Sequence, residues 1–159
     1  MKTVLGIGAG IGLTCGSWML VMGMTGWYKH PQLRNLFWLV ALLQIGVIVW
    51  GFRRTAATEG YGRQVGIGTF GSLVGGAILF GVSYLYTAVL FPKYFEEVCA
   101  VQKEIWKAEG KSDAMIQQAL AAAAPFQTSF WSAFFGFVGA AVTGLLVSLV
   151  LAAFFRKKT

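Results

Sequence analysis

Four long apolar runs divide the chain, and each is long enough to cross a lipid bilayer as a helix. They cover approximately residues 4–27, 33–52, 65–91 and 130–155. A membrane-spanning helix needs about 20 mainly apolar residues, because the hydrocarbon core of a bilayer is about 30 Å thick. Pro31, the double arginine Arg53-Arg54 and Pro92 interrupt the apolar pattern between the runs. The pattern predicts an all-α membrane protein, a four-helix transmembrane bundle in a single domain over residues 1–159.

The first run has a competing interpretation as a cleaved signal peptide, because Lys2 precedes it. The apolar core of a signal peptide contains about 7–15 residues, whereas this run continues to Trp27 without a clear small-residue cleavage site. We therefore expect an uncleaved transmembrane helix.

Residues 93–125 differ from the rest of the chain, because they hold most of its acidic residues. An apolar stripe from Tyr94 to Ile105 recurs at helical spacing. We expect Gly110 to end this helix and Ser112 to cap a second one. The segment is therefore predicted to be a helical hairpin outside the bilayer, between the third and fourth spans.

Composition and charge support a membrane setting. Only 12% of the residues are charged and 57% are hydrophobic, whereas a typical soluble domain is about 25% charged. The net charge of +7 would favour nucleic acid in a soluble protein. Here the basic residues lie beside apolar runs, where they orient helices and contact anionic lipid. We expect the lipid bilayer as the surroundings and no nucleic-acid partner.

Small residues recur every four positions on three of the four runs. Because lipid tails are as apolar as leucine, transmembrane helices associate by close packing over small side chains. The residues predicted to make such contacts are Gly8, Gly12, Gly16, Gly71, Gly75, Gly136, Ala140, Gly144 and Ser148. The spacing leaves open whether each partner helix belongs to the same chain or to another subunit.

Gln44 is the strongest polar group predicted to lie at membrane depth. We expect it to form a hydrogen bond between helices, with contact to a substrate as the alternative. No acid or base occupies the central part of any span. Such groups usually mark proton and ion pathways, so the pattern disfavours ion-coupled transport.

Candidate chemistry is sparse. The glycine-rich segment from Gly6 to Gly12 lacks the spacing of a dinucleotide-binding turn. It looks more like the glycine-rich helix of rotary ATP synthase proteolipids, but the spans lack the carboxylate that those proteins need. His30 is the sole histidine and cannot form a metal site or a catalytic triad by itself. We expect no cofactor, no metal and no enzymatic activity.

Several motifs follow one another in a recognisable order. Gly51-Phe52-Arg53-Arg54 ends the second span, Phe91-Pro92-Lys93-Tyr94-Phe95 precedes the charged hairpin, and Arg156-Lys157-Lys158 ends the chain. In this order the chain resembles a family of small bacterial four-span membrane proteins catalogued as domain of unknown function 4199. The resemblance covers most of the chain and implies the four-span architecture without supplying an activity.

The expected location is the bacterial inner (cytoplasmic) membrane. An even number of spans puts both termini on one face, and the basic clusters beside the spans favour the cytoplasm for that face. Aromatic residues are expected to form a belt at the opposite face. They are Trp27, Tyr28, Phe37, Trp38, Phe91, Tyr94, Phe126 and Trp131.

Three functional hypotheses remain open. The leading one is a non-enzymatic accessory or scaffolding subunit that packs against itself or a larger membrane complex. The alternative is a small transporter or channel for a neutral or apolar solute, with Gln44, Thr14 and Thr69 as its polar groups. A membrane enzyme acting on lipid would need a polar cluster at the interface, for which His30, Lys29 and Arg34 are the candidates.

Overall fold

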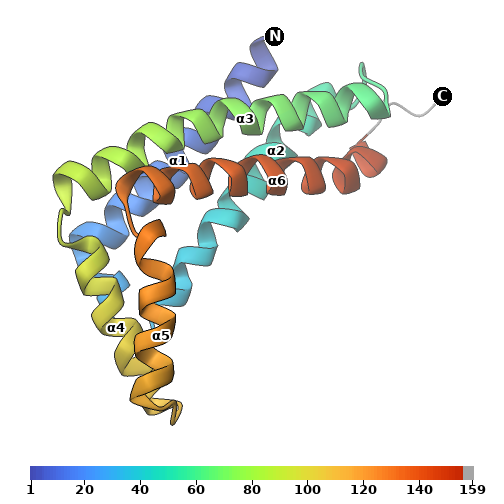
Figure 1. The fold of residues 1–159 in the computed structure, drawn as a ribbon. Coiled ribbons are helices and arrows are strands. Elements are labelled where there is room, and N and C mark those ends of the chain that lie inside the picture. Colours follow the sequence, from blue (N-terminus) through green and yellow to red (C-terminus); the bar gives the residue numbers. More distant parts are fainter. Residues whose placement is uncertain (156–159) are drawn as a thin grey trace.

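The computed structural model describes residues 1–155, and over this range the chain is helical without a β-strand (Figure 1). Four of its helices are long and apolar enough to cross a membrane. They contain α1 (Lys2–Thr25), α2 (Leu39–Thr55), α3 (Tyr61–Leu85) and α6 (Ser129–Phe155). The second and third spans also include a neighbouring turn and run over Asn35–Thr55 and Tyr61–Leu90. The predicted four-helix membrane architecture is confirmed. The basic tail Arg156-Lys157-Lys158 lies outside the described residues.

Short irregular turns extend the long helices. The 3-10 turn η2 (Arg34–Trp38) leads into α2, and the π-helical turn η3 (Tyr86–Leu90) continues α3. The loop after α1 contains another 3-10 turn, η1 (Trp27–Lys29). Figure 1 shows the N-terminus and the end of α6 at the end of the bundle where α2 turns into α3. We call this end the terminal face and the opposite end the hairpin face.

The third helix begins at Tyr61 rather than near residue 65, because the polar residues of its first turn have partners. Arg63 pairs with Glu59 at 2.9 Å. Gln64 is fully buried: its amide nitrogen donates to the carbonyl of Phe155 on α6, and its side-chain oxygen accepts from Thr55 on α2. A polar first turn is therefore part of the helix and ties three helices together at the terminal face.

The contact between α1 and α3 is built on glycines from both helices. A Cβ atom placed on Gly8 would lie 2.5 Å from Val74 Cγ1, and one on Gly75 would lie 2.7 Å from Ile11 Cβ. Real side chains essentially never approach so closely. The lack of a Cβ atom at these positions therefore allows the backbones of α1 and α3 to approach closely.

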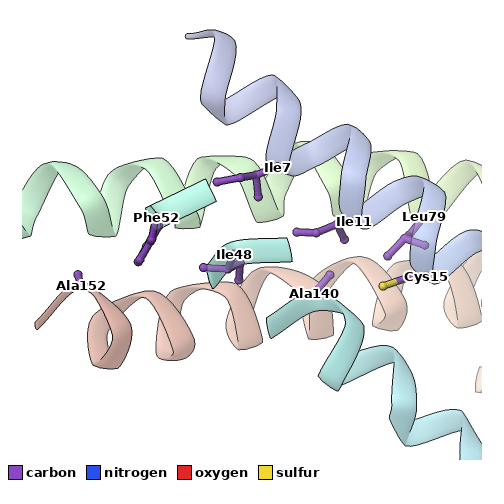
Figure 2. Packing of buried hydrophobic residues seen from close by; sticks show 8 residues of the cluster. All are labelled: Ile7, Ile11, Cys15, Ile48, Phe52, Leu79, Ala140 and Ala152. Atoms are coloured by element: carbon purple, nitrogen blue, oxygen red, sulfur yellow. The ribbon is translucent and has the colours of Figure 1, made fainter. Parts of the chain in front are cut away.

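The contact between α3 and α6 also depends on small residues. Ala140, Gly144 and Ser148 are buried. A Cβ atom on Gly144 would collide with the side chain of Ser72 on α3. Figure 2 shows buried side chains of α1 and α2 gathered beside α3 and α6, including Ile7, Ile11, Ile48 and Phe52, which are fully buried in this core.

The segment between α3 and α6 forms a helical hairpin of α4 (Tyr94–Ala108) and α5 (Asp113–Ala123). Gly110 has a φ of 78°, a conformation that side-chain-bearing residues rarely adopt, and it separates the two helices. The Ser112 hydroxyl accepts a hydrogen bond from the backbone N–H of Met115 at 3.4 Å and caps α5. Figure 1 shows the hairpin turned away from the long axes of α3 and α6.

Candidate functional site

The two ends of α2 differ in how they meet the rest of the bundle. Every buried residue of α2 lies at Gln44 or beyond it, toward the terminal face. Before Gln44, Trp38 and Leu42 are more than half exposed. Figure 1 shows α2 diverging from α6 as it approaches the hairpin face. The bundle is therefore closed on the terminal side of Gln44 and open on the hairpin side.

A cleft of about 480 Å³ occupies this open side. It lies between α2, α3 and α6, and the two ends of the hairpin segment close it at the hairpin face. Its walls include Val40, Ala41, Leu79, Phe95, Phe135, Gly136, Gly139 and Ala140. A neighbouring cavity of about 380 Å³ extends toward Asn35 and Gln102. The two share the lining residues Met19, Phe37, Trp38, Tyr86 and Tyr94, so they adjoin one another.

Gln44 lies at the inner end of the cleft and is 3% exposed. Its amide nitrogen donates to the carbonyl oxygen of Ala140 at 2.7 Å and to the hydroxyl oxygen of Ser72 at 3.4 Å. Because a backbone carbonyl can only accept, this contact fixes which end of the amide is the nitrogen. The side-chain amide of Gln44 is therefore a polar group at the inner end of the cleft, with its nitrogen held against α6 and α3.

The remaining lining is apolar or neutral. Among the described residues that line the cleft, none carries a charge. The Thr87 hydroxyl is already used, because it donates to the carbonyl of Ser83 at 3.0 Å. A pocket with apolar walls and few polar groups takes a mainly apolar ligand and orients it by those groups. The cleft is therefore suited to a neutral, mainly apolar molecule.

A second cluster holds the hairpin against the loop that follows α1. The Tyr28 hydroxyl donates to one oxygen of Glu97, and Lys29 Nζ lies 2.9 Å from the other. The ring of Tyr94 contacts the rings of Tyr28 and Tyr86, with centroids 5.1 and 5.5 Å apart. Both Tyr86 and Tyr94 also line the cleft, so the cluster joins the hairpin to the cleft wall.

Electrostatics keep this cluster in one protonation state near neutral pH. Burial, with the nearby Glu97 carboxylate second, raises the pKa of Tyr28 well above its usual value. The hydrogen bonds from Tyr28 and then from Lys29 lower the pKa of Glu97. Tyr28 therefore stays a neutral donor and Glu97 an anionic acceptor. A second tie lies nearby, where Cys99 Sγ donates to the Gln127 side-chain oxygen at 3.0 Å.

The residues singled out from the sequence separate into two places. Gly8, Gly12, Gly16, Gly71 and Gly75 lie in the contact between α1 and α3. Ala140, Gly144 and Ser148 face α3, whereas Gly136 has nothing within 4 Å of its Cβ position and lines the cleft with Gln44. Within residues 1–155, no three metal-ligating side chains of His, Cys, Asp or Glu come together.

Sequence reasoning missed the cleft and the Tyr28–Glu97 cluster. The sequence predicts Tyr28 as a member of an aromatic belt, and Tyr94 as a member of that belt and of the apolar stripe of the hairpin. Tyr28 and Glu97 are 69 positions apart, and no local pattern indicates that they meet. The available signal was the concentration of aromatic residues around the predicted hairpin.

Comparison with known proteins identifies a family to which the chain is similar. The model of a family described as "Protein of unknown function (DUF4199)" matches residues 7–157. The chain belongs to the DUF4199 family. No curated protein and no solved structure matches the chain significantly. The DUF4199 match includes most of α1 and the whole of α2 to α6, so the cleft lies within the shared region. The family description names no activity.

Proposed function

We propose that this DUF4199 protein is a non-enzymatic membrane protein that binds a small, neutral, mainly apolar molecule in the cleft beside Gln44, as the binding step of a small transporter. The observation that carries the proposal is the buried side-chain amide of Gln44 at the inner end of a mainly apolar cleft. A polar group in an apolar pocket orients a ligand by a hydrogen bond, and the Gln44 side-chain oxygen would accept one from a ligand donor.

The occupant would arrive sideways from the lipid. The cleft-lining Trp38 is 73% exposed and Phe135 is 52% exposed. Both residues belong to segments long and apolar enough to cross a membrane, so their exposed surface faces lipid. A molecule dissolved in the bilayer could pass between α2 and α6 without crossing the polar headgroup layer.

An accessory or scaffolding subunit is the other proposal that the sequence motivates. It rests on the small-residue stripes, whose partner helices the sequence leaves open, and on the outer hairpin as a surface for a partner. Most of those residues are covered by helices of the same chain, and Gly136 is the exception. The stripes therefore give this role less support than the cleft gives to ligand binding, and partner subunits or a homo-oligomer stay a prediction.

Native mass spectrometry of the protein with monooleoylglycerol tests ligand binding. This probe is neutral, has one apolar chain and carries hydroxyl donors. We expect the wild type to retain one bound molecule and Gly139→Phe to lose it, because a large ring on Gly139 fills the cleft. The matched control is Gly81→Phe on α3, where the added ring meets open space and the cleft is unchanged. Equal retention by the two variants, or none by the wild type, would contradict the proposal.

We further propose that the protein lies in the bacterial inner membrane with its terminal face in the cytoplasm. The support is Arg53 and Arg54 directly after α2, beside the span end, where basic residues favour the cytoplasmic side. In a background with both native cysteines replaced, Ala108→Cys in the hairpin should react in intact cells with a membrane-impermeant maleimide. Ala57→Cys in the loop after α2 should react only after lysis. The reverse labelling pattern would show that the hairpin face, and not the terminal face, lies in the cytoplasm.

A further inference from the structure

A separate groove runs between α1 and α2 on the terminal side of the molecule. It has a volume of about 430 Å³ and is lined by Gly6, Gly10 and Gly46 with Leu42, Val47 and Trp50 among others. No atom lies within 4 Å of the Cβ position of Gly46. The hydroxyl of Thr14, which also lines the groove, donates to the carbonyl of Gly10 at 2.7 Å. The groove therefore presents an apolar surface within the membrane span.

Cations gather at one end of this groove. The Arg54 guanidinium carbon lies 4.1 Å from the centre of the Trp50 ring. The same ring lies 3.8 Å from the Cβ position of Gly6 on α1. Lys2 is one helical turn from Gly6 toward the terminal face, and Arg53 lies beside Arg54. Three basic residues thus lie in the turns of α1 and α2 nearest the terminal face, beyond the end of the groove that Gly6 and Trp50 line.

These charges have no acidic partner in the part of the chain that the structure describes. The nearest acidic residue in the sequence, Glu59, is paired with Arg63 at 2.9 Å. The side chains of Lys2, Arg53 and Arg54 are in exposed residues and form no ion pair within residues 1–155. An apolar groove that ends in unneutralised cations at a membrane interface is complementary to an amphiphile with an anionic head.

We propose that this groove binds one anionic phospholipid of the terminal-face leaflet. One acyl chain lies along Gly6, Gly10 and Gly46, and the phosphate contacts Arg54 with Arg53 or Lys2 beside it. Trp50 sits where an aromatic residue is favoured at the membrane interface, and its ring holds the Arg54 guanidinium over the groove end. A partner helix or a second copy of this chain could fill the apolar part but would leave the three cations unexplained. This site is independent of the cleft.

The test uses nanodiscs of phosphatidylcholine that contain a minor fraction of phosphatidylglycerol. The lipids retained by the protein are counted by native mass spectrometry. We expect the wild type to retain one phosphatidylglycerol in preference to phosphatidylcholine. Arg54→Gln should lower that preference about fivefold, the effect of about one basic residue near an anionic surface. Gly46→Leu should remove it by filling the groove.

Two control variants separate a built site from a diffuse surface charge. Arg63→Gln removes the same charge at the same face but lies outside the groove. Gly66→Leu adds the same side chain on α3, where no atom lies within 4 Å. Both should retain phosphatidylglycerol as the wild type does. The proposal would be overturned if Arg63→Gln matched Arg54→Gln. It would also fail if Gly46→Leu left lipid binding intact, or if Gly46→Leu instead converted a dimer to a monomer.

Discussion

Two regions of the bundle are formed by apolar helices: the contact of α1 and α6 with α3, and the cleft beside α2. The two regions differ in the size of the residues that face each other. In the first region, Gly8, Gly75 and Gly144 let the helices approach until no Cβ would fit. In the second, the exposed aromatic residues Trp38 and Phe135 line the space between helices that stand apart.

The four-residue stripe on α6 crosses from one region into the other. Its members Ala140, Gly144 and Ser148 are buried against α3, whereas Gly136 lies in the cleft. A small residue therefore permits close approach but does not cause it. The neighbouring helix must also be directed toward that position, which is a property of the whole bundle.

The largest expected effect comes from closing the space at Gly144. Gly144→Ala places a methyl group onto the side chain of Ser72, and overpacking of this kind costs about 1–3 kcal/mol. We expect the free energy of unfolding, measured by titration with sodium dodecyl sulfate in mixed micelles, to fall by this amount. The matched control on the same helix is Gly136→Ala, which meets no atom within 4 Å and should leave stability unchanged or slightly raised. Equal losses in the two variants would mean that the contact between α3 and α6 is not tight.

Gln44 lies where the two regions meet, and its removal should have an intermediate effect. Gln44→Leu deletes the hydrogen bond to the Ala140 carbonyl. Hydrogen bonds between transmembrane helices contribute about 1 kcal/mol, so the same titration should show a loss of that size. Ser72→Ala removes only the longer bond of 3.4 Å and serves as the comparison. If Ser72→Ala lost as much stability as Gln44→Leu, the bond between Gln44 and Ser72, and not the bond to Ala140, would account for the stabilisation.

The smallest expected effect is local to the hairpin. Because the pKa of Glu97 is lowered in the folded protein, its contribution to hairpin docking is present above its ordinary pKa of 4.5. It is lost as the pH falls through the lowered, folded value. Amide exchange in α4, corrected for the intrinsic dependence on pH, should therefore rise over this acidic range in the wild type. Glu97→Gln should already show faster exchange at neutral pH, with little further change on acidification. A wild type and variant with the same pH profile would contradict this role for Glu97.

The sequence predicts well the features of this fold that repeat along a single helix. It predicts poorly the contacts between residues from distant segments. The four spans follow from hydrophobic length, and the hairpin follows from the charge shift with Gly110 and Ser112. The stripe of Gly8 and Gly12 identifies a contact face, because spacing along a helix determines which residues share a face. Spacing alone does not identify α3 as the partner helix.

The cleft depends on the direction in which α2 crosses the bundle, and that direction leaves no periodic trace in the sequence. Gln44 was expected to form a hydrogen bond between helices, yet its position beside an open cavity required the structure. The meeting of Tyr28 with Glu97 required it as well, because the two residues come from distant segments. In both cases the missing information is the relative placement of elements that are individually well predicted.

Cysteine crosslinking across the two regions tests the central difference most directly. In a background with Cys15→Ala and Cys99→Ser, the pair Gly16→Cys with Val82→Cys spans the contact between α1 and α3. The Cβ position of Gly16 lies 4.0 Å from Val82 Cβ, within the separation that a disulfide allows. The pair Ala41→Cys with Gly139→Cys spans the cleft, where no atom lies within 4 Å of the Gly139 Cβ position.

Mild oxidation in the membrane should form the disulfide of the first pair rapidly. The second pair should require a bifunctional reagent with a spacer. Rapid disulfide formation by both pairs would show that α2 and α6 close on each other and would contradict the cleft.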